Sequence, residues 1–201
     1  MNELLPTAPM EIVYLTGAPG TGKSSLAQSL AERFSNVKIF SYGERMVNRL
    51  QSTTRLIKDQ VELRGGPDPV VMPADILAVD REMVAWVQST RVGRLLLIDT
   101  HQVTLEQACL RFVPFQPSTL DELPLTRIWF LSAAAETVVQ RTTKQQMGRI
   151  IPSINTAALH ASAQLAVAVH YSVVKGVELR MFDSDCSMDR LAEKAISTLG
   201  L

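Results

Sequence analysis

The stretch of sequence that decides the fold reads Gly17-Ala18-Pro19-Gly20-Thr21-Gly22-Lys23-Ser24. It matches the pattern G-x-x-x-x-G-K-S/T, in which the glycines let the backbone curl so that several N–H groups point at phosphate oxygens. The apolar run 11–16 before it predicts a buried strand, and the apolar spacing after it predicts a helix over 24–34. An accidental glycine turn is the competing interpretation, and the strand–loop–helix context disfavours it. We therefore expect this loop to bind the phosphates of ATP or GTP.

Within this loop, residue chemistry suggests separate roles. The ammonium of Lys23 is expected at the β- and γ-phosphates, and the hydroxyl of Ser24 is expected to ligate Mg²⁺. The N-terminus of the following helix adds the positive end of its dipole. Residues 17–24 and the next residue, Ser25, are therefore the predicted nucleotide-binding residues.

Asp99 is the natural second metal-site residue. It ends the aliphatic run 95–98, as the magnesium-positioning carboxylate of such folds does. A turn residue or helix N-cap is the alternative interpretation. The polar neighbours Thr100 and His101 favour a site at this strand end.

Apolar runs alternate with helix-spaced segments along the whole chain, and this pattern predicts an α/β fold. We expect a parallel sheet with helices on both faces, the three-layer P-loop NTPase fold, in a single domain over residues 1–201. The predicted strands cover 11–16, 37–40, 95–99, 126–131 and 177–182. The predicted helices cover 24–34, 44–63, 73–90, 134–143, 156–174 and 188–199, and the segment 114–124 is expected to be a proline-rich loop.

The amino-acid composition limits the classes of binding partner that we expect. Lys plus Arg and Asp plus Glu each number 20, so a net charge of zero gives no general attraction to nucleic acid or to an anionic membrane. The two cysteines have no C-x-x-C spacing, which disfavours a disulfide framework or a zinc site and suits a cytoplasmic protein. No stretch approaches the roughly eighteen uninterrupted apolar residues of a membrane span. We expect ATP and a small-molecule acceptor as partners, without nucleic acid or membrane, and leave an oligomer open.

The loop GAPGTGKS resembles that of the nucleoside monophosphate kinases, and the layout of the chain is most similar to the archaeal-type adenylate kinases. The loop lies near the N-terminus, and three shorter motifs follow it in the family's order. These motifs are the strand end Phe40-Ser41-Tyr42-Gly43, the strand end Asp99-Thr100-His101, and the late helix with His170-Tyr171 before Gly176 and the last strand.

This resemblance implies Mg²⁺-dependent transfer of the γ-phosphoryl group of ATP to AMP. It implies an acceptor-binding region over about 41–75 and a lid over about 141–153. Arginines suit such a lid because a planar guanidinium neutralises, bidentately, the charge spread over the transferred group. The resemblance gives Arg141 and Arg149 as catalytic lid residues beside Lys23, and Tyr42, Gly43, Arg64 and His101 as acceptor-binding residues, with Arg45 and Arg55 as alternatives to Arg64.

The late helix departs from the family pattern. The family places an arginine about six residues before the tyrosine, whereas the segment 164–169 reads QLAVAV. Two other functions therefore stay open: a P-loop kinase with a different small-molecule acceptor, and a nucleotide-binding ATPase or switch that signals through a partner. Neutral charge and the lack of a basic stripe disfavour a nucleic-acid enzyme.

Overall fold

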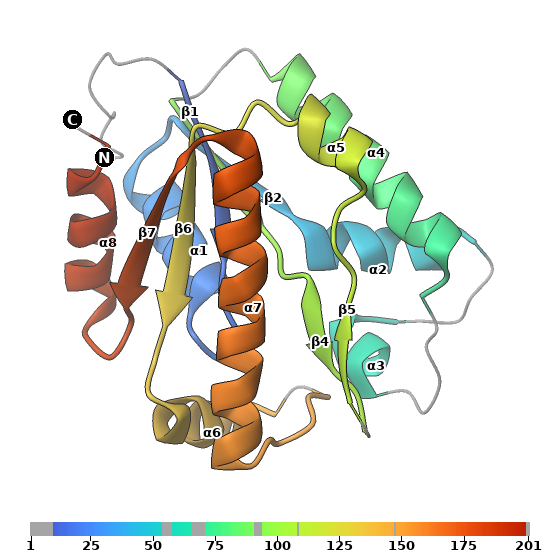
Figure 1. The fold of residues 1–201 in the computed structure, drawn as a ribbon, viewed down its shortest axis with the longest axis vertical. Coiled ribbons are helices and arrows are strands. Elements are labelled where there is room, and N and C mark those ends of the chain that lie inside the picture. The colour runs from blue at the N-terminus through green and yellow to red at the C-terminus, as the bar shows by residue number, and fades with distance from the viewer. Residues whose placement is uncertain are drawn as a thin grey trace.

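The computed structural model describes residues 10–53, 58–65, 71–90, 94–107, 109–146 and 148–199, which form a sheet with helices on both faces (Figure 1). The main sheet has five parallel strands in the order β2-β3-β1-β6-β7, and a separate antiparallel pair joins β4 and β5. The strands are β1 (Glu11–Thr16), β2 (Val37–Ser41), β3 (Leu95–Asp99), β4 (Val103–Leu105), β5 (Leu110–Phe112), β6 (Arg127–Ser132) and β7 (Glu178–Asp183). The helices are α1 (Lys23–Arg33), α2 (Tyr42–Ser52), α3 (Gln60–Gly65), α4 (Pro73–Ser89), α5 (Pro117–Glu122), α6 (Ala135–Lys144), α7 (Ile154–Lys175) and α8 (Met188–Ser197).

Alternation along the central strand separates two hydrophobic cores. Val13 and Leu15 point toward α1 and α8, whereas Ile12 and Tyr14 point toward α2, α4, α5 and α7. All four side chains are almost fully buried, as expected for a parallel sheet covered on both faces. This arrangement confirms the predicted three-layer α/β fold.

Strand order places the predicted site at one edge of the sheet. β1 lies between β3 and β6, and Leu15 of β1 is in register with Asp99 of β3. Because parallel strands end at the same edge, the loop after β1 and the carboxylate at the end of β3 become neighbours although 75 residues separate Ser24 from Asp99.

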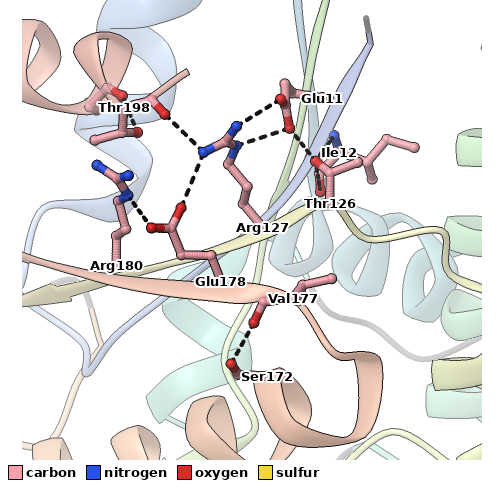
Figure 2. Close-up of polar contacts among 10 residues, drawn as sticks. Glu11, Ile12, Thr126, Arg127, Ser172, Val177, Glu178, Arg180 and Thr198 are labelled. Atoms are coloured by element: carbon pink, nitrogen blue, oxygen red, sulfur yellow. Dashed lines mark hydrogen bonds and ion pairs between the residues drawn. The ribbon is translucent and has the colours of Figure 1, made fainter. Parts of the chain in front are cut away.

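The opposite edge carries an ionic cluster (Figure 2). Glu11, Arg127 and Glu178 are the first residues of the neighbouring strands β1, β6 and β7. The Arg127 guanidinium donates to both oxygens of Glu11 at 3.1 Å and to Glu178 at 3.2 Å. It also donates to the carbonyl of Thr198 at 2.8 Å, which joins the end of α8 to the sheet.

Local chemistry sets several helix ends. Pro73 begins α4, where its missing N–H has no intrahelical partner to lose. Ser153 caps α7 by accepting from the backbone N–H of Thr156, and Gly176 ends that helix with a φ of 62°. Ser187 caps α8 in the same way as Ser153 caps α7.

The single helix predicted over 44–63 is wrong, because the structure has two shorter helices there. α2 ends at Ser52 and α3 begins at Gln60. The hydroxyls of Ser52 and Thr53 donate to backbone carbonyls in the last turn of α2, and such local bonds compete with helix continuation. The proline-rich segment predicted as a loop contains α5, and the β4–β5 hairpin was not predicted.

Within the described ranges, α7 alone is long and apolar enough to cross a membrane by length and composition. A core helix of a soluble protein meets the same criteria, and α7 lies along the sheet (Figure 1). Its inner face buries Tyr171 and four shorter side chains, and its outer face leaves Leu159 and Val173 exposed.

Candidate active site

The loop after β1 adopts the curled conformation that the motif predicts. Gly17 has a φ of 145°, and a Cβ at this position would lie 2.3 Å from the carbonyl oxygen of Leu131 at the end of β6. Gly22, the N-cap of α1, has a φ of 89°. Only glycine adopts both conformations readily, so the loop passes close to β6 and then enters the helix. Thr21 holds the turn closed through its hydroxyl, which donates to the carbonyl of Ala18 at 2.8 Å.

Lys23, the first residue of α1, lies inside this loop. Its side chain is buried, and the Nζ atom donates to the carbonyls of Gly17 at 2.7 Å and Ala18 at 3.1 Å. The ammonium is therefore held beside the loop amides and the N-terminus of α1, where an anion is favoured. This is the position from which it could exchange backbone carbonyls for phosphate oxygens.

Ser24 and Asp99 meet directly. The Ser24 hydroxyl donates to Oδ2 of Asp99 at 2.6 Å, while Asp99 is mostly buried and Ser24 is exposed. A hydroxyl and a carboxylate are oxygen donors of the kind that Mg²⁺ takes, usually together with substrate phosphates and water. Among the described residues, no group of three or more acidic, His or Cys side chains could form a metal cage. The pair therefore fits Mg²⁺ delivered with a nucleotide.

A buried polar network supports the same strand ends, and sequence reasoning missed it. On α7, Gln164 donates from Nε2 to the Thr16 hydroxyl at 2.9 Å and accepts at Oε1 from the N–H groups of Gln102 at 3.1 Å and Val103 at 2.9 Å. One turn earlier, Nε2 of His160 bonds the carbonyl of Val103 at 2.9 Å. A signal was available, because two polar residues four positions apart lie on one face of a mostly apolar helix.

His160 is neutral at neutral pH in this environment. Burial lowers the pKa of its imidazole, the bond to the Val103 carbonyl raises the pKa in part, and the charge of Lys23 lowers it further. The imidazole therefore donates from Nε2 to the carbonyl without bringing a second positive charge beside the loop.

The two predicted lid arginines differ in their surroundings. Arg141, in the last turn of α6, donates to the carbonyl of Ser184 at 2.9 Å and pairs with Asp185 at 3.4 Å. Its guanidinium is thus held by the loop after β7. Arg149 is partly buried, burial lowers its pKa, and no described carboxylate pairs with it.

The predicted lid rests on the predicted acceptor region. Gly148 has a φ of 75°, and a Cβ there would lie 2.1 Å from the carbonyl oxygen of Val61 in α3. The two backbones are therefore in direct contact across the edge of the sheet.

The predicted acceptor residues mostly face other parts of the protein. The Tyr42 hydroxyl donates to Oδ1 of Asp80 on α4 at 2.8 Å, and burial raises the pKa of both side chains. Gly43 lies against the side-chain amide of Gln60. His101 is exposed just after β3.

Two arginines of the predicted acceptor region form ion pairs with α4. Arg45 pairs with Glu82 at 2.9 Å, and Arg49 pairs with Asp75 at 3.6 Å, so both cations of α2 are engaged by α4. The Arg64 side chain and the whole of Arg55 lie outside the described part of the chain.

Comparison with known proteins gives the family and the fold of the chain. Residues 16–158 match the model of an AAA-domain family, which is well over half of the chain. The chain belongs to this AAA-domain family. A comparison with curated proteins finds no match.

This AAA-domain protein is also similar in fold to a solved structure. The structure, from Chloroflexus aurantiacus J-10-fl, is described as a "putative kinase" and has a TM-score of 0.54 and 16% identity, with 97% of this chain and 98% of that chain covered. At this identity the similarity establishes the fold alone. The AAA-domain protein thus has a three-layer α/β P-loop fold, with the Lys23 loop and the Ser24–Asp99 pair at the carboxyl edge of its sheet.

Proposed function

We propose that this protein transfers the γ-phosphoryl group of magnesium ATP to a nucleoside monophosphate, with AMP as the acceptor to test first. The observation that supports this most is the 2.6 Å hydrogen bond between Ser24 and Asp99, next to the loop that encloses Lys23. A loop that only turns the chain needs neither a buried lysine nor a carboxylate on the next strand.

The residues would divide the work as follows. The loop amides and Lys23 bind the donor phosphates, and Ser24, with Asp99 behind it, holds Mg²⁺. Bound Mg²⁺ neutralises charge on the β- and γ-phosphate oxygens. Arg149 lacks a carboxylate partner among the described residues, so it is available to neutralise the transferred group. No protein nucleophile is needed, because the acceptor oxygen attacks directly.

Arg141 has a different place in this scheme. Its contacts with Ser184 and Asp185 put it at the loop after β7 rather than inside the phosphate loop. We propose that Arg141 sets the position of that loop on the donor side, and that closure of residues 141–153 excludes water from the transferred phosphate.

A second candidate is a kinase of the same architecture whose acceptor carries no phosphate. The pairing of Arg45 with Glu82 and of Arg49 with Asp75 favours it, because both cations that α2 could offer an acceptor phosphate are neutralised. The absence of arginine from residues 164–169 points the same way.

A coupled assay with purified protein, Mg²⁺ and either ATP or GTP, run against each monophosphate and then a metabolite pool, tests both candidates. Turnover with AMP supports the first, and turnover only with a phosphate-free acceptor supports the second. Asp99→Asn should lower transfer by about 10²-fold and raise the Mg²⁺ requirement, whereas Asp121→Asn on α5 should change neither. Nucleotide binding without transfer to any acceptor would contradict both candidates and indicate a switch.

A further inference from the structure

Gln164 is an unusual residue for its position. Its side chain is fully buried in the middle of a helix that is otherwise mostly apolar. Burying an amide is unfavourable unless its hydrogen bonds are made. Here Oε1 accepts two backbone N–H groups, from Gln102 and Val103, and Nε2 donates to Thr16.

These bonds join α7 to two segments of the candidate site. Thr16 is the last residue of β1 and directly precedes the phosphate loop. Gln102 and Val103 follow Asp99 by three and four residues. The Gln164 side chain therefore connects the start of the loop to the backbone that leaves the metal-site carboxylate.

Other polar groups of this backbone are bonded as well. The Thr100 N–H donates to the carbonyl of Leu15 at 3.3 Å, and the Gln102 carbonyl accepts from Val113 N–H at 2.7 Å. The Tyr14 hydroxyl bonds the side chain of Gln102. A buried network in which each member is bonded holds one arrangement of the chain, and Gln164 is its only member with three bonds to two strand ends.

We propose that Gln164 is a positioning residue for the Ser24–Asp99 pair, and that it acts by fixing residues 100–103 relative to Thr16. This inference rests on the proposed function only where Mg²⁺ is concerned. The Asp99 carboxylate must lie within hydrogen-bond reach of Ser24, so movement of the segment that follows Asp99 changes their separation.

The variant Gln164→Leu keeps the approximate side-chain size and removes all three bonds. Tyr171→Phe is the matched control: it lies on the same inner face of α7, is about equally buried, and loses one bond, from the Phe115 N–H, which does not involve residues 16 or 100–103. Thr16→Val removes one of the three bonds and serves as a second variant if Gln164→Leu does not fold.

The first measurement is amide hydrogen exchange in the metal-free protein. Exchange at Gln102 and Val103 should rise by about tenfold or more in Gln164→Leu and to a smaller extent in Thr16→Val. It should stay unchanged at these amides in Tyr171→Phe, even if that variant melts at a lower temperature. Unchanged exchange at residues 100–103 in both Gln164→Leu and Thr16→Val would overturn the inference without involving nucleotide.

The second measurement is the affinity for a non-hydrolysable ATP analogue with Mg²⁺ and with EDTA. The increase in analogue affinity caused by Mg²⁺ should be roughly tenfold smaller in Gln164→Leu than in the wild type. In EDTA, the affinities of the two proteins should agree within about twofold. Equal losses with Mg²⁺ and EDTA, or the same loss in Tyr171→Phe, would show a general structural effect and contradict the proposal. If the wild type does not bind the analogue, the proposed function fails, and the exchange measurement still decides whether Gln164 holds the segment.

Discussion

At the amino edge of the sheet, the guanidinium of Arg127 bonds both oxygens of Glu11, one oxygen of Glu178 and the Thr198 carbonyl (Figure 2). At the carboxyl edge, the partly buried Arg149 pairs with no described carboxylate. Burial affects the pKa of both arginines. The hydrogen bond to Glu11 raises the pKa of Arg127, while burial lowers that of Arg149.

Arg127 is compensated within the folded protein, whereas Arg149 is the cation that we propose for a ligand. A partly buried charge is costly until a partner compensates it. The charge of Arg127 is compensated by carboxylates of the protein, so Arg127 stabilises the fold. The charge of Arg149 would be compensated by a bound anion, so Arg149 would stabilise the complex with that anion.

Lys23→Ala is the substitution for which we expect the largest loss of activity. Phosphoryl transfer should fall by roughly 10³-fold, because the ammonium is the charge enclosed by the loop that we expect to bind the phosphates. The coupled assay measures the loss, and thermal melting should show a folded protein. Lys38→Ala, an exposed lysine on β2, is the control and should keep full activity. Retained transfer in Lys23→Ala would contradict the role given to the loop.

Arg149→Ala should reduce kcat by about 10²-fold, because the transferred group would lose the guanidinium that neutralises its charge. Its stability should be unchanged or slightly increased, since no carboxylate in the described part of the chain would lose a partner. Steady-state kinetics and a melting curve measure the two effects. A loss of stability without a loss of kcat would show that Arg149, like Arg127, stabilises the fold. It would contradict the role that we propose for Arg149 in phosphoryl transfer.

Arg127→Leu should show the reverse behaviour. Its free energy of unfolding should fall by about 2 kcal/mol, between the values for exposed and fully buried pairs, with kcat nearly unchanged. Arg180→Leu removes an exposed partner of Glu178 and should cost well under half as much. Denaturant titration of the two variants measures the difference, and equal costs would contradict the importance of burial for the Arg127 cluster.

The same cluster predicts a pH dependence. Burial alone would raise the pKa of Glu11, but the hydrogen bonds from Arg127 and Thr126 lower it below 4.5. A depressed carboxyl pKa stabilises the fold above the unfolded-state value, and this stabilisation is lost as pH falls through the folded-state pKa. The wild type should therefore lose stability relative to Arg127→Leu when pH falls below about 4.5. Parallel stability curves for the two proteins in this range would contradict the prediction.

Among the changes at the carboxyl edge, Arg141→Ala should have the smallest effect on catalysis. Because its guanidinium holds Ser184 and Asp185 in the loop after β7, the KM for ATP should rise by about three- to tenfold while kcat changes little. Asp185→Asn, which weakens the same pair, should raise KM in the same direction. A large fall in kcat instead would show that Arg141 acts on the transferred group, as the resemblance implies.

The sequence allowed the carboxyl edge to be predicted better than the amino edge. The phosphate loop is a local motif, and Asp99 follows an uninterrupted aliphatic strand, so neither prediction required knowledge of strand register. The Arg127 cluster depends on β1, β6 and β7 being neighbours in a shared register, which single strands do not reveal. A local pattern is readable from one segment, whereas an ion pair across the sheet requires the order of the strands.

The acceptor side shows a different limit. Tyr42 and Arg45 lie at the predicted strand end, yet the Tyr42 hydroxyl faces Asp80 and Arg45 pairs with Glu82. Their partners are on α4, 38 and 37 residues later in the chain. Side-chain direction at a helix start depends on which helix packs against it, and spacing along the chain does not specify that.

The contact between Gly148 and the Val61 carbonyl has a consequence for how the protein tolerates change. The backbones of the two segments are in contact, and this contact requires glycine because any other amino acid has a Cβ atom at this position. Alanine at residue 148 would force the segments apart without altering any residue that we expect to bind nucleotide. If the protein has the proposed function, such a variant would bind ATP normally but would transfer the phosphoryl group to water. Binding of the donor nucleotide and exclusion of water from the transferred group would then depend on different parts of the chain.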